Sequence, residues 1–362
     1  GRAAEPSSAP PRAAEIPSGR RQHYIFSCIL KGENKMHGLT AVGDILADYT
    51  PLPSSGRSRY EFMTNIGGTA TDCAAAASRL GLTTVLVGRT GEDFMGEYAM
   101  NILQDYGVDT SQISRDSGRF TAHNFISLDA DGERRFTFGT RSSAFQQLGL
   151  EHIDLDAVFD CRMLYLTGMD LVDGPVLSTT NVLVREARLR GIPVAFDLNY
   201  RDALFSGLPQ FQDRVGFILP YVSFIKGARD EFEAVLGTQD LAELGARLSA
   251  AGPELIIMTE DGRGASYWWD GVTRHFDAVD IEVVDTTGAG DCFMGAALSG
   301  LDRIGGLPAL SHERLADIMA HANAAAAICT SGFGAIAPLP DLDAVERRLD
   351  GAEFGATLAR VV

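Results

Sequence analysis

The residues with the clearest chemical potential lie in IEVVDTTGAGDCFMGAALSG (281–300), where a β-branched run leads through a glycine-rich turn into a helix of small and apolar residues. Gly288 and Gly290 let the backbone approach a ligand closely. The helix that follows offers unpaired N–H groups and a positive dipole end, which together bind anions. Asp291 falls in its first turn, where a carboxylate either caps the helix or accepts a proton from a hydroxyl that attacks a bound phosphate.

The elements that must position this segment alternate between short β-rich runs and helical stretches. Several runs are apolar throughout, as expected for parallel strands buried on both faces. This alternation predicts an α/β fold with a doubly wound, mostly parallel sheet flanked by helices, whose ligands bind beyond the carboxyl ends of the strands. The predicted strands lie at 39–43, 83–88, 163–168, 194–199, 222–227 and 255–260, and the predicted helices include 69–81, 176–191 and 240–252.

Two stretches interrupt this rhythm, 49–64 and 118–138, and they predict a small antiparallel β lid over one end of the sheet. Within the second stretch, DADG between FISL and RRFTF is a hairpin signal. Residues 1–37 are rich in Pro, Ala, Ser and Arg and are predicted to form a disordered tail, with a targeting segment or a mis-assigned start as alternatives. We therefore expect one domain at 38–345 and a C-terminal tail at 346–362.

Composition narrows the function classes. The formal net charge is −17, so the surface repels phosphate backbones and anionic lipid, and neither nucleic acid nor a membrane is an expected partner. The five cysteines include no CxxC pair and indicate a reduced, cytoplasmic protein. No P-loop motif G-x-x-x-x-G-K-[ST] is present, so a nucleotide would have to be bound through backbone amides, a helix N-terminus or a metal ion.

The motif DTTGAGD (285–291) closely resembles the C-terminal signature D-T-x-G-A-G-D of the ribokinase-like (PfkB) carbohydrate kinases. The resemblance extends over roughly residues 38–345 and implies the ribokinase-like fold. It implies that Asp291 is the catalytic base. The amides of Gly288, Ala289 and Gly290 would then form the anion hole for the transferring phosphoryl group.

On the sugar side, GDILAD resembles the family's opening G-x-x-x-x-D, which implies that Asp48 binds sugar hydroxyls. NIGGTATDCAAAASRLG resembles the N-terminal signature G-G-x-x-x-N, with Gly67 and Gly68 against the sugar and Asp72 where the family has Asn. An ionised Asp72 can only accept hydrogen bonds. Together with Asp48 it would place two carboxylates in one pocket, which favours a neutral sugar over a sugar acid.

Two further stretches resemble the fructokinase and ketodeoxygluconate kinase branches of the family. FTFGTRSSAFQQL implies that Arg141 reaches the sugar from the lid, although an ordinary surface arginine is the alternative. FDLNYR implies that Asn199 and Arg201 face the substrate and the transferring phosphoryl group. An arginine at a strand end in that place suits phosphate.

The resemblance also implies sites for ions. IKGARDEFEAVLG lies where the family carries N-x-x-E, which organises Mg²⁺ through water; Glu231 matches the Glu, and Ala228 stands in place of the Asn. Asp285 and Thr287 match positions that border a monovalent-cation site, so K⁺ stimulation is expected.

The nucleotide would lie along the C-terminal part of the sheet. MTEDGRGA resembles the family's T-x-G-x-x-G, with Thr259 and Gly264 matching and Asp261 replacing the first Gly. The closing helix and loop, HANAAAAICTSGFGAIAPLP, imply that Asn323 faces adenine and that Gly334 bends the chain around it.

Taken together, the resemblance implies an ATP-dependent kinase that phosphorylates a hydroxyl of a small neutral sugar, fructose first, with Mg²⁺ and K⁺ as ions and a homodimer formed through the lid. A sugar-acid kinase of the 2-keto-3-deoxygluconate type and a nucleoside kinase are alternatives within the superfamily. Outside the enzymes, the alternative is a non-catalytic sugar- or nucleotide-binding relative. The complete glycine loop with Asp291 speaks against that alternative.

Overall fold

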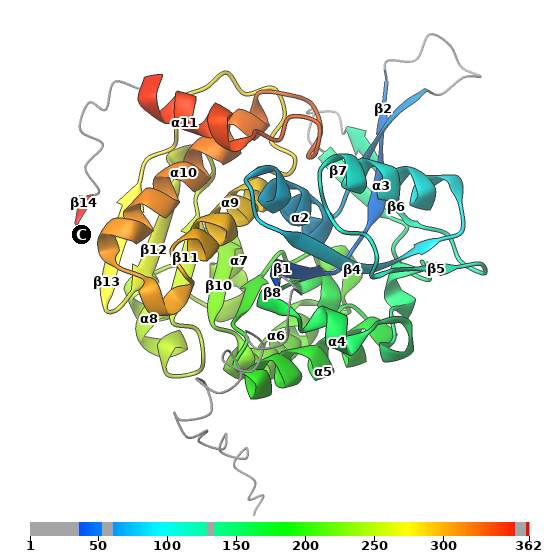
Figure 1. Cartoon of the computed structure of the whole chain (residues 1–362), viewed down its shortest axis with the longest axis horizontal. Helices are drawn as coiled ribbons and strands as arrows, with labels where there is room; N and C mark the ends of the chain where they lie inside the picture. Colours follow the sequence, from blue (N-terminus) through cyan, green and yellow to red (C-terminus); the bar gives the residue numbers. More distant parts are fainter. Residues whose placement is uncertain (1–35, 53–60, 129–133, 352–359, 362) are drawn as a thin grey trace, which may run out of the picture. The chain divides into compact units, whose positions relative to one another are not determined.

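The structure is a computed structural model that describes residues 36–52, 61–128, 134–351 and 360–361. Most of the predicted N-terminal tail therefore lies outside the described residues. The main feature is a ten-stranded sheet with the order β14-β13-β12-β11-β10-β9-β8-β1-β4-β5 (Figure 1). The strands from β11 to β5 run parallel, as predicted: β11 (Leu255–Thr259), β10 (Phe224–Ala228), β9 (Val194–Asp197), β8 (Cys161–Thr167), β1 (His37–Val42), β4 (Thr84–Gly91) and β5 (Ile113–Asp116).

One edge of this sheet is antiparallel, which the sequence reasoning did not predict. It is built from β12 (Ala265–Trp269), β13 (Val272–Phe276) and β14 (Arg360–Val361). The sequence did contain a signal for the first hairpin, the pair Asp270-Gly271. These two residues join β12 to β13 with φ values of 49° and 76°. Two residues with positive φ form the tight turn that suits a hairpin, and Asp-Gly is a favoured pair for it.

Helices cover both faces of the sheet, and each group encloses its own hydrophobic core (Figure 1). The first face carries α2 (Thr69–Arg79), α3 (Phe94–Asp105), α9 (Ala289–Arg303), α10 (His312–Thr330) and α11 (Leu342–Gly351). The second carries α4 (Leu155–Val158), α5 (Pro175–Arg190), α6 (Leu208–Ile218), α7 (Arg229–Leu236) and α8 (Leu241–Ser249). Helix α11 crosses residue 345, where the sequence analysis placed the end of the domain. None of the helices in the described part of the chain combines the length and apolarity that a membrane crossing requires.

Helix α9 is the most deeply packed of the helices that concern the site. Every residue from Cys292 to Leu301 is buried. The helix lies against α2 so closely that a Cβ on Gly295 would be 2.7 Å from the Cβ of Ala76. Small residues allow this approach, and the core thereby fixes the helix whose first turn carries Asp291.

The predicted lid is a four-stranded sheet with the order β3-β2-β6-β7 (Figure 1). It is built from two segments of the chain, one that follows β1 and one that follows β5. Its strands are β3 (Phe62–Gly67), β2 (Leu46–Pro51), β6 (Ala122–Leu128) and β7 (Arg134–Phe138). The outer pairings are antiparallel as predicted, whereas the central pair, β2 with β6, is parallel. The turn predicted at DADG falls outside the described residues.

Candidate active site

The predicted site residues gather at the carboxyl ends of the parallel strands. The strands that follow β1 in the chain lie to one side of it as β4 and β5, and to the other side as β8 to β11. Such a reversal opens a crevice at the strand ends, where ligands of open α/β sheets bind. The loops after β1 and β9 and the last residues of β10 all reach this crevice.

The glycine turn before α9 has the backbone that an anion site needs. Gly288 caps the helix with a φ of 76°, and a Cβ there would lie 2.5 Å from the Cβ of Ala335. Only glycine combines this conformation with so close an approach. The cap residue Gly288 has no side chain to bond to α9, and no hydrogen bond joins the Asp291 carboxyl to an amide of this turn in the described part of the chain. The capping interpretation of Asp291 therefore receives no support. Of the amides in this turn, that of Ala289 donates to the Thr286 carbonyl at 3.3 Å.

Asp291 is half-buried in the third position of α9. Burial raises the pKa of its carboxyl to about 8, and the charge of Asp197 adds to this shift. Lys226 and Arg201 oppose the shift, because positive charges favour the ionised form. A carboxyl that titrates near neutral pH is suited to exchange protons with a substrate.

Lys226 was missed by the sequence reasoning. Its Nζ lies 2.8 Å from Oδ2 of Asp197, and the two side chains are only 7% and 1% exposed. A Cβ on Gly290 would lie 3.0 Å from the same Nζ, so the ammonium sits beside the first turn of α9. Burial lowers the pKa of Lys226, but the charges of Asp197, Asp291 and Glu231 raise it on balance. The sequence signal that could have indicated Lys226 is a charged residue following each of two apolar runs, Asp197 after one and Lys226 after the other. The two runs form paired strands in which Lys226 lies opposite Asp197.

Asp48 and Asp72 face one another across Gly67. An ideal Cβ on Gly67 would lie 3.4 Å from Oδ2 of Asp48 and 3.5 Å from Oδ2 of Asp72. Asp48, in the lid strand β2, accepts a hydrogen bond of 2.9 Å from Nδ2 of Asn124. The structure thus brings the two predicted sugar-binding carboxyls to one point.

The start of α2 is fixed by a carboxylate that the sequence analysis left unassigned. Asp44 accepts hydrogen bonds of 3.2 Å from the amides of both Thr69 and Ala70. Gly68 precedes the helix with a φ of 120°, and a Cβ there would lie 2.4 Å from the Asp44 carbonyl oxygen. The segment Gly67–Gly68 therefore lies tightly against the loop that follows β1.

Three side chains were predicted to reach the substrate from the β9 loop and the lid, and each contacts a different part of the protein. Asn199 has a positive φ of 33° and donates from its amide to Oγ1 of Thr69. Arg201 is exposed, donates to the Tyr200 carbonyl and lies 3.5 Å from Oε1 of Glu231. Arg141 is exposed and donates to the Ala203 carbonyl at 3.3 Å. Asn199 thus lies beside the Gly67–Gly68 segment, and the charge of Arg201 lowers the pKa of Asp291.

Glu231 is bound by backbone groups on both oxygens. Its Oε2 accepts from the amide of Ala228 at 2.9 Å, and its Oε1 accepts from the amide of Tyr200 at 3.0 Å. It therefore anchors the β9 loop to the start of α7, and a Mg²⁺ ion would contact it through water on the remaining lone pairs. Within the described residues, no three His, Cys, Asp or Glu side chains are grouped to hold a metal ion. Mg²⁺ commonly keeps waters and takes ligands from substrate phosphates, so such a grouping is not required.

The residues expected around the nucleotide support the backbone on that side of the sheet. The amide of Asn323 donates at 3.3 Å to the carbonyls of both Phe276 and Asp277. A Cβ on Gly264 would lie 2.1 Å from the same Phe276 oxygen. Thr259, at the end of β11, donates to the Gly227 carbonyl at 3.4 Å. Asn323 and Gly264 thus meet at the end of β13, where they shape the loop that leads to the glycine turn.

The departure at position 261 has a simple structural explanation. Asp261 adopts a φ of 51°, a conformation that glycine prefers and that Asp and Asn tolerate better than other residues. The substitution therefore preserves the turn after β11.

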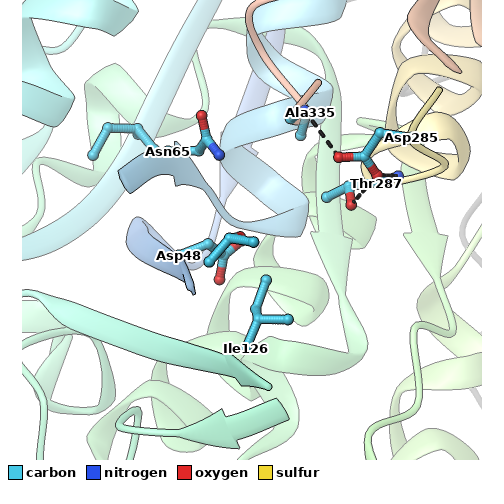
Figure 2. A pocket seen from close by; sticks show the side chains of 9 residues that line it. Asp48, Asn65, Ile126, Asp285, Thr287 and Ala335 are labelled. Carbon is cyan, nitrogen blue, oxygen red and sulfur yellow. Dashed lines mark hydrogen bonds between the residues drawn. The ribbon is translucent and has the colours of Figure 1, made fainter. Parts of the chain in front are cut away.

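Asp285 joins the glycine turn to the closing loop. Its Oδ1 accepts from the amide and the hydroxyl of Thr287, at 2.9 and 2.7 Å, and its Oδ2 accepts from the amide of Gly334 at 3.1 Å. Figure 2 shows these residues lining a pocket opposite Asp48, Asn65 and Ile126 of the lid. The structure therefore places the predicted cation-site residues together, on the wall of the pocket that faces the lid.

Comparison with known proteins identifies the family. The model of the pfkB family carbohydrate kinases matches residues 36–342. A fructokinase of Klebsiella pneumoniae is 31% identical over 309 residues, covering 85% of this chain and 98% of that protein. The crystal structure of a Xylella fastidiosa fructokinase with bound ATP has a TM-score of 0.80 and 25% identity, and covers 86% of this chain and 98% of its own. A Vibrio cholerae O395 fructokinase, in a form with bound fructose, ADP and calcium, has a TM-score of 0.76 and 26% identity and covers 87% and 99%. Both the expected family and the ribokinase-like fold are confirmed: the chain belongs to the pfkB family of carbohydrate kinases.

Proposed function

We propose that this carbohydrate kinase transfers the terminal phosphoryl group of ATP to a hydroxyl of a small neutral sugar, with fructose as the first candidate. The observation that carries the proposal is the arrangement around the first turn of α9. There the Lys226 ammonium lies 3.0 Å from the Cβ position of Gly290, the neighbour of Asp291 in the chain, and the charge of Asp291 raises the pKa of Asp72 on the sugar side. A proton acceptor, a cation and a row of amides thus share one end of the crevice.

In the proposed reaction Asp291 accepts the proton of the sugar hydroxyl. The hydroxyl oxygen then forms the new bond to phosphorus while the bond from phosphorus to the leaving phosphate oxygen breaks. The leaving group departs as ADP, and Asp291 later releases its proton to solvent. This division of work leaves positioning and charge stabilisation to the protein, as is usual in phosphoryl transfer.

The amides of Gly288, Ala289 and Gly290 would stabilise the charge on the transferring group, supported by the helix dipole and by Lys226. Glu231 is the residue that would hold Mg²⁺ through water, and the ion would supply positive charge to neutralise the phosphates. K⁺ would lie near Asp285, Thr287 and Gly334, whose hydrogen bonds already draw the glycine turn and the closing loop together.

Charge favours a neutral sugar over a sugar acid, although for a different reason than the sequence suggested. The sequence argument assumed an ionised Asp72, whereas burial and neighbouring charges raise the pKa of Asp72 well above its usual range. The remaining case rests on Asp48 and on the two arginines. Arg141 is turned to a backbone carbonyl, and Arg201 is shared with Glu231. The Vibrio cholerae relative binds fructose, which makes a ketose the first sugar to test.

We also propose a homodimer formed through the lid. Tyr49 and Phe125 stack with ring centroids 5.1 Å apart, and Phe62 meets Phe125 edge-on at 5.8 Å. Phe125 is 42% exposed, so this aromatic group offers a second copy an apolar surface. A reducing, cytoplasmic location is supported by Cys73, Cys161, Cys292 and Cys329, which are buried free thiols.

The function is tested by measuring ATP consumption over a panel of ketoses, aldoses, sugar acids and nucleosides, with the Asp291→Asn variant as the blank. We expect the highest kcat/KM for fructose or another neutral ketose. A nucleoside or a sugar acid at the top of the panel would overturn the substrate assignment. Sugar-dependent turnover that is equal in the blank would overturn the role of Asp291.

A further inference from the structure

Asp72 stands where the family signature has Asn, and its surroundings differ from those of every other carboxyl at the site. It lies in the first turn of α2 and is only 5% exposed. Its carboxyl borders the same point as that of Asp48, since both oxygens of Asp72 lie within 3.6 Å of the Cβ position of Gly67. The group is therefore aimed at the place where the sugar would lie.

No hydrogen bond or ion pair joins the Asp72 side chain to any residue that the structure describes, and its Oδ1 is fully buried. The contrast with Asp44 is direct, because both carboxyls lie at the start of α2. Asp44 takes the amides of Thr69 and Ala70, so those donors are not available to Asp72. An ionised carboxylate buried without donors is strongly unfavourable, and such a group keeps its proton instead.

The largest charge effects on the pKa of Asp72 come from acidic groups on four elements. Asp291 approaches from α9, Asp48 from β2, Asp44 from the loop after β1, and the Cys329 thiol from α10. Desolvation is the largest cause of the raised pKa of Asp72, and these neighbours increase it further. Like charges around a buried acid are a known way to keep a carboxylic acid neutral.

A protonated carboxyl has the hydrogen-bonding character of the amide that it replaces. It offers one O–H donor and one carbonyl acceptor, whereas an ionised carboxylate only accepts. We propose that Asp72 is protonated in the working enzyme and donates a hydrogen bond to a sugar oxygen, so that it performs the role of an amide in sugar binding. The inference rests on the proposed sugar-kinase function, because it assigns the donor to that function's substrate.

The proton itself is tested without turnover. The infrared spectrum of the wild type minus that of Asp72→Asn, recorded at pH 7, should contain the carbonyl band of a protonated carboxylic acid. As the matched control, Asp302→Asn should remove only carboxylate bands, because Arg162 Nη2 lies 2.8 Å from Asp302 Oδ2. If the Asp72 difference spectrum also contained only carboxylate bands, the proposal would be wrong. This result does not depend on whether any sugar is phosphorylated.

The donor is tested by two variants in the sugar assay at pH 7. Asp72→Asn keeps a donor and should hold the KM for fructose within about 3-fold of the wild type, whereas Asp72→Leu should raise it roughly 10-fold or more. The KM for ATP should stay unchanged in both variants. Equal KM values in the two variants, or a loss above about 10-fold in Asp72→Asn, would overturn the inference while leaving the kinase function intact.

Charge discrimination gives an independent readout. The ratio of kcat/KM for fructose to that for 2-keto-3-deoxygluconate should be the same in the wild type and in Asp72→Asn at pH 7, because neither side chain is charged. A shift toward the acid in the variant would mean that Asp72 is ionised, and the proposal would fail.

Discussion

The Nζ of Lys226 lies 2.8 Å from Oδ2 of Asp197 in a buried pair beside the first turn of α9. Asp197 ends β9 and Lys226 is the middle residue of the neighbouring parallel strand β10, so the two lie opposite one another in register. Oδ1 of Asp197 is fully buried and has no hydrogen-bond partner in the described part of the chain. Only one oxygen of the Asp197 carboxylate is therefore paired, and the positive charge of Lys226 also lowers the pKa of Asp291.

Removing this ammonium should alter both rate and pH dependence. We expect Lys226→Met to lower kcat/KM at pH 7 by roughly 10²-fold, comparable to the loss of one donor from an oxyanion hole. Because Lys226 holds down the pKa of Asp291, the acidic limb of the pH–rate profile should also move upward. Arg89→Met breaks another ion pair, with Asp116 at 3.1 Å, and should leave the profile unchanged. A lower rate without a shifted limb would reduce Lys226 to a structural role.

Asp291→Asn should lower kcat by roughly 10²-fold or more, since general-base catalysis contributes 10²–10⁴-fold. ATP binding, measured by calorimetry, should survive, because the glycine turn is retained. The control is Asp302→Asn near the other end of α9, which removes a carboxylate paired with Arg162. Normal turnover by the Asp291 variant would end the proposed mechanism.

The pH dependence of kcat/KM reports the base in the free enzyme. Asp291 must be ionised to accept a proton, and its pKa is raised to about 8. We therefore expect kcat/KM to fall about tenfold for each pH unit below that value and to level off above it. Rates measured with saturating coupling enzymes from pH 6 to pH 9.5 decide this; a flat profile below pH 8 is incompatible with Asp291 as the base.

Potassium should stimulate the reaction. Asp285 holds Thr287 and Gly334 together, and a cation beside this carboxylate would reinforce the turn before α9. Initial rates in KCl should exceed those in tetramethylammonium chloride at equal ionic strength. Asp285→Asn should abolish the difference. Equal rates of the wild type in both salts would count against a cation site here.

The lid should mediate self-association. Phe125→Asp places a charge in the aromatic group with Tyr49 and should shift the protein from dimer to monomer in sedimentation velocity. Phe94→Asp is the matched control, because Phe94 is 75% exposed and lies on α3 rather than on the lid sheet. An unchanged sedimentation coefficient for the Phe125 variant would place any interface elsewhere.

The sequence could predict those parts of the site that are contiguous in the chain. The turn before Asp291 and the segment Gly67–Gly68 are local motifs, and their backbone conformations follow from their glycines. The pair Lys226–Asp197 and the bond from Glu231 to the Tyr200 amide join residues 29 and 31 positions apart. Such contacts depend on strand order and register, which single-sequence patterns do not determine.

The orientation of polar side chains was harder to predict than their position. Asn323 is expected to face adenine, and the sequence did not indicate that its amide also donates to the Phe276 and Asp277 carbonyls. Buried amides must satisfy their donors, and the nearest unpaired carbonyls compete with any ligand. The charge of Asp72 likewise depends on which neighbouring amides are already bound, and only the three-dimensional arrangement shows that Asp44 has taken them.

The continuous burial of α9 from Cys292 to Leu301 has a consequence for how this enzyme could diversify. A helix enclosed in the core accepts few substitutions, so the phosphate-transfer end of the site is held nearly constant. The lid strands that carry Asp48 and Asn124 have a solvent-exposed side and can change with little effect on the core. Changes of sugar preference can therefore arise in one module while the chemistry remains fixed in the other, and directed evolution of new specificities is best begun in β2 and β6.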